Sequence, residues 1–263
     1  MNDPIVIRRA ESVEDYRACQ EAQRLAWGIR EDNYVVPVAT MVGAQLHGGL
    51  VLGAFLPDGR AVGLSFAFLG RIEGRLCLYS QLTGVVPGYQ DQGLGRRLKT
   101  AQRDIAWQED VPCIAWAFDP LQAGNARFNL EKLGATGVKF VENMYGSRSD
   151  ALNQDTPTDR LIVVWETSPG PERAETNPAA IEGLPRLIDP ATGFVGLPDD
   201  GAPCLLPIPG AITRLRAESP ETAARWGRAV REAFVAAFDA GYRAIGFVRE
   251  ATSGGGFYLL KQP

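Results

Sequence analysis

The stretch that decides the fold reads Val85-Val86-Pro87-Gly88-Tyr89-Gln90-Asp91-Gln92-Gly93-Leu94-Gly95-Arg96-Arg97-Leu98-Lys99. An apolar strand ends in a proline turn, a Gln-x-x-Gly-x-Gly loop follows, and a basic helix begins. Glycines at 93 and 95 let the backbone approach a ligand closely, because they carry no Cβ. The start of a helix also presents unpaired N–H groups and a partial positive charge. The stretch therefore predicts a cradle for a pyrophosphate.

Other phosphate loops do not fit this stretch. A dinucleotide-binding fingerprint needs a third glycine where this chain has Leu98, and the Walker pattern occurs nowhere in the sequence. The stretch resembles the acyl-CoA loop of the GNAT acetyltransferase superfamily. That loop reads Arg/Gln-x-x-Gly-x-Gly/Ala at the end of the fourth strand, after a Val-x-Pro-x-Tyr-like approach that Val86 to Gln90 supply.

The resemblance implies an acyl-CoA co-substrate, no metal, and a splayed mixed sheet flanked by helices. It further implies that a backbone N–H near Val85 or Val86 stabilises the oxyanion of acyl transfer. The cofactor-binding residues that it implies are Val85, Val86, Gln90, Asp91, Gln92, Gly93, Leu94, Gly95, Arg96, Asn125 and Phe128.

The helix that follows the loop is amphipathic. Its predicted inner face consists of Leu94, Leu98, Ala101 and Ile105. Its predicted solvent face consists of Arg96, Arg97, Lys99 and Arg103.

Hydrophobic periodicity and turn residues predict an α/β chain. Ser12 should cap a helix that ends at Gly28, and a second helix should run over 36–46. The predicted strands are 5–8, 50–56, 61–69, 76–86, 113–118, 138–143 and 161–165, and a further helix is predicted over 122–133. The resulting order of elements is the GNAT order.

Composition narrows the class of protein. The chain has 263 residues, 45% of them hydrophobic and 22% charged, with a net charge of −4. Such a chain can bury a core, and its acidity argues against nucleic acid as the main partner. The four cysteines lack metal-ligand spacing and are predicted to be buried thiols. Since no targeting or membrane segment is evident, a cytoplasmic protein is expected, and a homodimer stays open.

A second GNAT landmark is only partly kept. Aligning on Lys132, Leu133 and Gly134 places Ala126 on the family's alanine, but Leu130 occupies the position of a tyrosine that often protonates the coenzyme A thiolate. Three alternatives follow: another acid such as Tyr145, protonation by water, or binding of acyl-CoA without turnover. A wider pattern over 118–146 resembles a bacterial branch of GNAT proteins with a C-terminal extension.

No single general base stands out. A water held by Ser80 or Gln81 on the fourth strand is the preferred candidate, and the other candidates are Glu73, Tyr79, Glu142 and Asp159. His47, the only histidine, is interpreted as a helix-end or surface residue. Asp159 and Arg160 begin a strand that in this fold borders the acceptor pocket, and Arg160 could clamp a substrate carboxylate.

The rest of the chain changes character. Nine prolines predict that residues 167–210 form an extended arm, and residues 211–263 predict a smaller α/β unit packed on the first domain or on a partner subunit. That unit should hold strands at 212–216, 244–248 and 257–260, with a helix starting at Ser219-Pro220 and ending at Gly241. The predicted acyltransferase domain covers residues 1–166.

The function that the sequence predicts is transfer of an acetyl or other short acyl group from acyl-CoA to an amine of a small molecule, such as an amino acid. The alternative is an acyl-CoA-binding sensor whose GNAT site is degenerate, since Leu130 cannot donate a proton.

Overall fold

The computed structural model describes residues 5–31, 34–90, 92–146, 157–170, 181–250 and 254–263. Contacts divide the chain into two compact units, one of residues 1–116 and 166–169, the other of residues 117–165 and 170–263. The division falls inside strand β5 (Cys113–Phe118). The three-part organisation inferred from the sequence stays a prediction.

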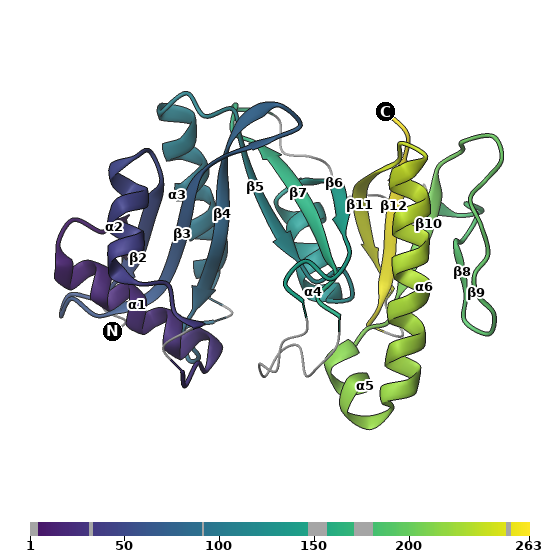
Figure 1. Cartoon of the computed structure of the whole chain (residues 1–263), viewed down its shortest axis with the longest axis horizontal. Helices are drawn as coiled ribbons and strands as arrows, with labels where there is room; N and C mark the ends of the chain where they lie inside the picture. Colours follow the sequence, from purple (N-terminus) through teal and green to yellow (C-terminus); the bar gives the residue numbers. More distant parts are fainter. Residues whose placement is uncertain (1–4, 32–33, 91, 147–156, 171–180, 251–253) are drawn as a thin grey trace. The chain divides into compact units, whose positions relative to one another are not determined.

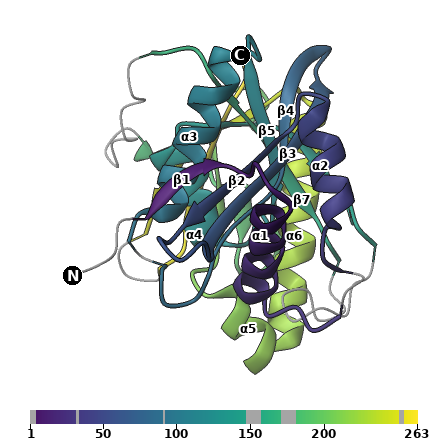
Figure 2. The same ribbon diagram turned by 90° about the vertical axis from the view of Figure 1, so that its left-hand side faces the viewer.

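The first unit is a sheet covered by helices on both faces (Figures 1 and 2). Its strands follow the order β1 (Val6–Arg9), β2 (Leu50–Phe55), β3 (Ala61–Ile72), β4 (Arg75–Val85) and β5. Pairing is antiparallel from β1 to β4, whereas β5 runs parallel to β4. Helices α1 (Val13–Trp27) and α2 (Val38–Leu46) cover one face, and α3 (Leu94–Gln108) covers the other.

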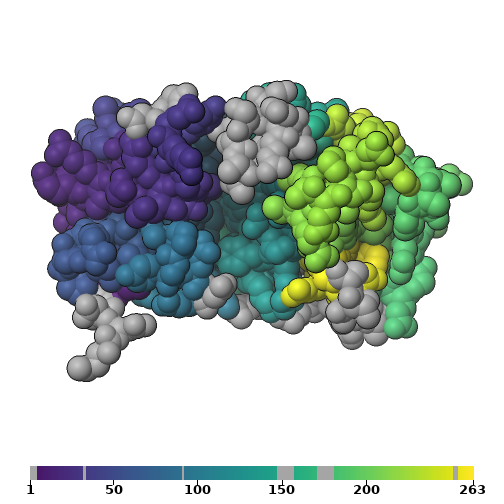
Figure 3. Space-filling view, turned by 90° about the horizontal axis from the view of Figure 1, so that it is seen from below, coloured from purple at the N-terminus to yellow at the C-terminus, as the bar shows by residue number. Residues whose placement is uncertain are grey.

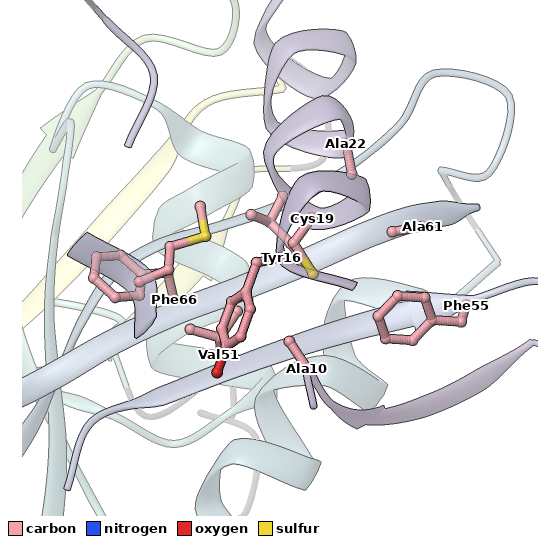
Figure 4. Close-up of a cluster of buried hydrophobic side chains, with 10 residues drawn as sticks. Ala10, Tyr16, Cys19, Ala22, Val51, Phe55, Ala61 and Phe66 are labelled. Carbon is pink, nitrogen blue, oxygen red and sulfur yellow. The ribbon is translucent and has the colours of Figure 1, made fainter. Parts of the chain in front are cut away.

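The α1/α2 face carries an apolar core (Figure 4). Its buried side chains come from α1, α2, β2 and β3, and they include Tyr16, Cys19, Met41, Val51 and Phe66. The predicted cap of α1 is confirmed, since Ser12 Oγ accepts a hydrogen bond of 3.1 Å from the N–H of Asp15 and Gly28 ends the helix. Burial of these side chains fixes which face of β3 and β4 points toward α1 and α2.

The named strands of the second unit's main sheet region pair antiparallel with one another. Its strands follow the order β7 (Arg160–Glu166), β6 (Thr136–Val141), β11 (Arg243–Arg249), β12 (Gly256–Lys261) and β10 (Cys204–Ile208). The helices of this unit are α4 (Ala123–Ala126), the π-helix η2 (Arg127–Lys132), α5 (Ile212–Glu218) and α6 (Pro220–Asp239), and a small ribbon pairs β8 (Ile188–Asp189) with β9 (Gly193–Phe194). The outer side of α5 and α6 forms an exposed face, coloured yellow-green in Figure 3.

Aromatic packing joins segments of the second unit that are far apart in sequence. Phe234 of α6 stacks on Phe140 of β6 at 5.2 Å, and Tyr258 of β12 meets the edges of Phe234 and Phe247. β6 also pairs with β11 at Gly137 and Ala244. Residues 136–141 and the C-terminal strands therefore share one core.

One predicted element of the second unit is wrong. Residues 212–216 form helix α5 rather than a strand, because Ile212 and Leu215 lie three residues apart and face the same side. The predicted arm contains strand β10 despite Pro207. β10 is an edge strand that pairs only with β12 among the named strands, and an edge tolerates a residue that has no N–H to donate.

Candidate functional site

The loop after β4 is a structured turn held by its own side chains. Gly88 has a φ of +92°, a left-handed value that suits glycine, and the N–H of Tyr89 closes the turn on the oxygen of Val86 at 3.0 Å. The side chain of Gln90 turns back and donates to the oxygen of Val85 at 3.0 Å. Gln90 thus stabilises the loop backbone. Asp91, one of the predicted cofactor-binding residues, lies outside the described residues.

Helix α3 begins at a glycine cap. Gly93 is the N-cap residue with a φ of +71°, and it has no side chain that could accept from the first N–H groups of the helix. A Cβ built at Gly93 or Gly95 would meet no atom within 4 Å. The first turn holds no acidic residue, and Arg96 and Arg97 are exposed. The helix start is an open, cationic surface that suits an anionic ligand.

On the edge of β4 next to this loop, some backbone groups point away from β3. The N–H of Val86 donates to the oxygen of Val62, so it is not available to an oxyanion, contrary to one of the two sequence-based choices. Because Val85 lies opposite Gly63 and Thr83 opposite Ser65, antiparallel alternation turns the N–H groups of Val85 and Thr83 away from β3.

In the described part of the chain, β5 pairs with only a short part of this edge of β4. The described parallel pairs between β4 and β5 are Leu78 with Ile114 and Tyr79 with Ala115, and none is present further along β4 among the described residues. The described ladder between the two strands therefore ends at Tyr79, and the splay of the sheet stays a prediction.

A β-bulge interrupts β4 at Gln81. Phe66 lies opposite Leu82 and Ala67 opposite Ser80, so Gln81 is the extra residue. Its side chain is exposed and lines an open pocket of about 580 Å³ on the α1/α2 face. The residues that line the pocket are Tyr34, Val35, Val36, Pro37, Thr40, Ala44, Phe66, Phe68 and Gln81.

Two glutamines of α1 hold the segment that forms one wall of this pocket. Gln23 accepts from the N–H of Val36 at 3.1 Å and donates to the oxygen of Tyr34 at 3.3 Å. Gln20 donates to the oxygen of Val36 at 3.0 Å. The wall is thus fixed by side-chain hydrogen bonds to the backbone, and the pocket is mostly apolar with a few polar groups, as small-molecule sites usually are.

Ser80 and Gln81, the two predicted catalytic residues of β4, point to opposite faces. Ser80 is only 4% exposed, and its Oγ accepts from Nζ of Lys99 at 2.7 Å on the α3 face. The predicted solvent exposure of Lys99 is wrong, because this side chain is 5% exposed and packed between β4 and β5. Of the pair, only Gln81 reaches the pocket.

The remaining predicted residues lie in the second unit. Asn125 is exposed on α4, Phe128 is half-buried in the π-helix, and Leu130 is buried. The guanidinium of Arg160 lies 5.3 Å from the ring centroid of Tyr145 and donates to the oxygen of Asp159 at 2.8 Å.

Asp159 already has partners for both carboxylate oxygens. It accepts two hydrogen bonds of 2.9 Å from Arg231 and one of 2.9 Å from the N–H of Asn143. These contacts give Asp159 a structural role and leave Arg160 as the substrate-binding candidate of the pair.

Sequence reasoning missed the pocket and the burial of Lys99. The pocket combines residues 34–44 with single positions on β3 and β4, and no periodic signal connects them. For Lys99, a signal existed: Gln102 lies one turn later on the same helix, and β3 and β4 carry Ser65, Ser80 and Thr83 within apolar runs. Other predictions are confirmed, since all four cysteines are buried and unpaired and His47 is an exposed helix-end residue.

No family model matches the sequence, and no curated protein does. Among solved structures, the chain is similar to yncA of Salmonella typhimurium, a candidate acetyltransferase solved with its cofactor acetyl-CoA. The two sequences are 21% identical, the match covers 67% of this chain and 99% of that chain, and the TM-score is 0.50. The ribosomal-protein-S18-alanine N-acetyltransferase of Escherichia coli matches with 19% identity, 66% and 100% coverage, and a TM-score of 0.48. A GNAT-family acetyltransferase of Desulfovibrio desulfuricans matches with 18% identity, 63% and 100% coverage, and a TM-score of 0.49.

The likeness to yncA shows the fold alone: the chain has the mixed α/β fold of that GNAT-type structure. The narrower resemblance to a bacterial branch stays a prediction. No helix in the described part of the chain is long and apolar enough to span a bilayer.

Proposed function

We propose that the protein transfers a short acyl group from acyl-CoA to the amine of a small molecule. The observation that carries the proposal is the arrangement at the end of β4 in the first unit. Three features follow one another along β4 and the loop after it. They are an apolar pocket beside the bulge at Gln81, outward N–H groups at Thr83 and Val85, and the open, cationic start of α3.

Each part has a role in the reaction. The start of α3 holds the pyrophosphate of coenzyme A through backbone N–H groups. The neutral acceptor amine attacks the thioester carbonyl, its nitrogen then gives up one proton to an ordered water held by Gln81, and the N–H groups of Thr83 and Val85 stabilise the oxyanion that forms. The tetrahedral intermediate collapses, the C–S bond breaks, and the thiolate leaves. A thiol with a pKa near 8.5 is a good leaving group at neutral pH, so the apolar Leu130 is compatible with turnover.

The pocket favours an amine that carries an apolar or aromatic group. Tyr34, Phe66 and Phe68 supply aromatic surface, and Gln81 can hold the amine or an ordered water. Arg160 belongs to the second unit and stays a predicted substrate-binding residue. A free peptide N-terminus is the competing acceptor, because one protein of similar fold is an N-acetyltransferase of a ribosomal-protein alanine.

The test is release of free thiol from acetyl-CoA across a panel of phenethylamine, free amino acids and short peptides. We expect release with at least one small amine, and a loss of about tenfold or more in kcat/KM for Gln81→Ala, because the variant lacks the only amide side chain among the described residues that line the pocket. Tight acetyl-CoA binding with no acceptor-dependent release would refute transfer and support the sensor. Preference for peptides over every small amine would refute the acceptor class.

A further inference from the structure

A lysine is buried in the first unit on the α3 face of the sheet. Lys99 is 5% exposed, and three neighbours surround its Nζ. Nζ donates to Ser80 Oγ at 2.7 Å and to Gln102 Oε1 at 3.2 Å, and it lies 4.1 Å from the centroid of the Trp116 ring. An ammonium has three N–H groups, so these contacts use all three directions.

The hydrogen bonds continue into the sheet. Gln102 donates to Ser65 Oγ at 3.0 Å, and Ser65 shares a hydrogen bond of 3.0 Å with Thr83. Every buried side-chain nitrogen and oxygen in the described part of the chain has a partner. The network is fully satisfied, which makes it rigid.

Folding alone does not explain this lysine. Among the described residues, no acidic side chain bonds to Lys99, and burial is the only cause that lowers its pKa, to about 7. An apolar side chain of similar length would avoid the cost of removing an amine from water. Burying the Lys99 amine therefore lowers the stability of the fold, and stability alone does not account for a lysine at this position.

The position of Nζ suggests that role. The parallel pairs between β4 and β5 end with Tyr79 and Ala115, and the next residues along the two strands are Ser80 and Trp116. These are the two strand residues that Nζ contacts. The amine lies where the described backbone ladder between the two strands ends.

We infer that Lys99 is a positioning residue that fixes the end of the β4–β5 ladder, and with it the part of β4 that receives the acyl-pantetheine end of the donor. This inference rests on the proposed function. Lys99 acts through Ser80, which is followed along β4 by the bulge at Gln81 and by the N–H groups of Thr83 and Val85. It does not touch the reacting atoms, because its donors are already in use.

Calorimetric titration with two probes tests the inference. Acetyl-CoA needs both the loop and the part of β4 beyond Tyr79, whereas adenosine 3′,5′-bisphosphate lacks the pantetheine arm and needs only the loop. Lys99→Met should weaken acetyl-CoA binding about tenfold, the loss expected when one charge-assisted hydrogen bond is removed, and leave binding of the bisphosphate unchanged. Arg103→Met, on the same helix outside the network, should change neither affinity.

A double-mutant cycle adds a measurement that a merely structural role would not move. If Lys99 acts through Ser80, then Ser80→Ala should weaken acetyl-CoA binding, and the double variant should bind no more weakly than Lys99→Met alone. Equal acetyl-CoA affinity of wild type and Lys99→Met would overturn the inference while the proposed function stands. Failure of the wild type to bind acetyl-CoA would overturn the proposed function, and the inference with it.

Discussion

Replacing Lys99 by methionine should change how stability depends on pH. Burial lowers the pKa of Lys99 from 10.5 to about 7 in the folded protein. Between these values the unfolded chain binds one proton more than the folded chain, so the free energy of unfolding rises with pH. The destabilisation by Lys99 is therefore largest below pH 7 and is relieved progressively between pH 7 and 10.5. Methionine has no charge to bury, so the variant should lack this rise.

The magnitude follows from the two pKa values. One pH unit inside the window corresponds to about 1.4 kcal/mol, and half of the folded molecules are already neutral at pH 7. From pH 7 to pH 9, Lys99 should therefore add about 2 kcal/mol to the free energy of unfolding of the wild type. The assay is urea unfolding followed by circular dichroism at intervals between pH 6 and pH 9, with wild type and Lys99→Met measured in parallel.

The difference between the two proteins isolates Lys99. Burial raises the pKa of several cysteines, Cys19 to about 12, and their ionisation also affects stability at high pH. These contributions are equal in both proteins and cancel in the difference. Hydrogen bonds that the variant loses at Ser80 and Gln102 shift the difference without giving it a slope. A difference that stays constant from pH 6 to pH 9 would refute the burial of a titrating amine at this site.

Three further predictions concern other parts of the chain. Gly93→Asp should weaken coenzyme A binding at least about tenfold more than Gly93→Ala does. Both variants strain a left-handed backbone, but only aspartate repels the pyrophosphate. Equal losses of affinity would contradict an anion site at this helix start. Arg231→Met should lower the free energy of unfolding by about 1 to 3 kcal/mol, because Asp159 loses the guanidinium that donates two hydrogen bonds to it. The control Arg214→Met removes an exposed ion pair with Glu218 and should change the free energy of unfolding by less than about 1 kcal/mol. A thiol reagent at pH 8 should modify none of the four buried cysteines in the native protein and all four after unfolding; rapid native labelling would contradict their burial.

The sequence predicts the first unit well because its signals are local. Ser12 and Gly28 bound α1, the hairpin at Glu73-Gly74 joins β3 to β4, and β5 starts and ends at the predicted residues. Each of these features depends on a cap, a turn or an alternation within a few residues. The loop at Gln90–Gly95 belongs to the same class, since its glycines and the following helix are adjacent in sequence.

Features that depend on distant residues could not be predicted in this way. Lys99 looks like a solvent-facing lysine until Ser80 and Trp116 are placed beside it by the sheet. The pocket requires the long connection around Tyr34 to lie over β3 and β4. In the second unit, Ile212 and Leu215 fit a strand or a helix over so short a stretch, and packing decides between the two.

The bulge at Gln81 can be understood by asking what β4 would be without it. Tyr79 contacts Phe68 on the pocket side, Ser80 faces α3, Leu82 packs with the α1/α2 core, and Thr83 bonds to Ser65. Removing Gln81 from this series leaves an unbroken alternation of faces, so the strand needs no extra residue to direct its side chains correctly. Gln81 is an insertion into an otherwise regular strand. A shorter chain could keep the same two faces, but it would place no amide in the pocket.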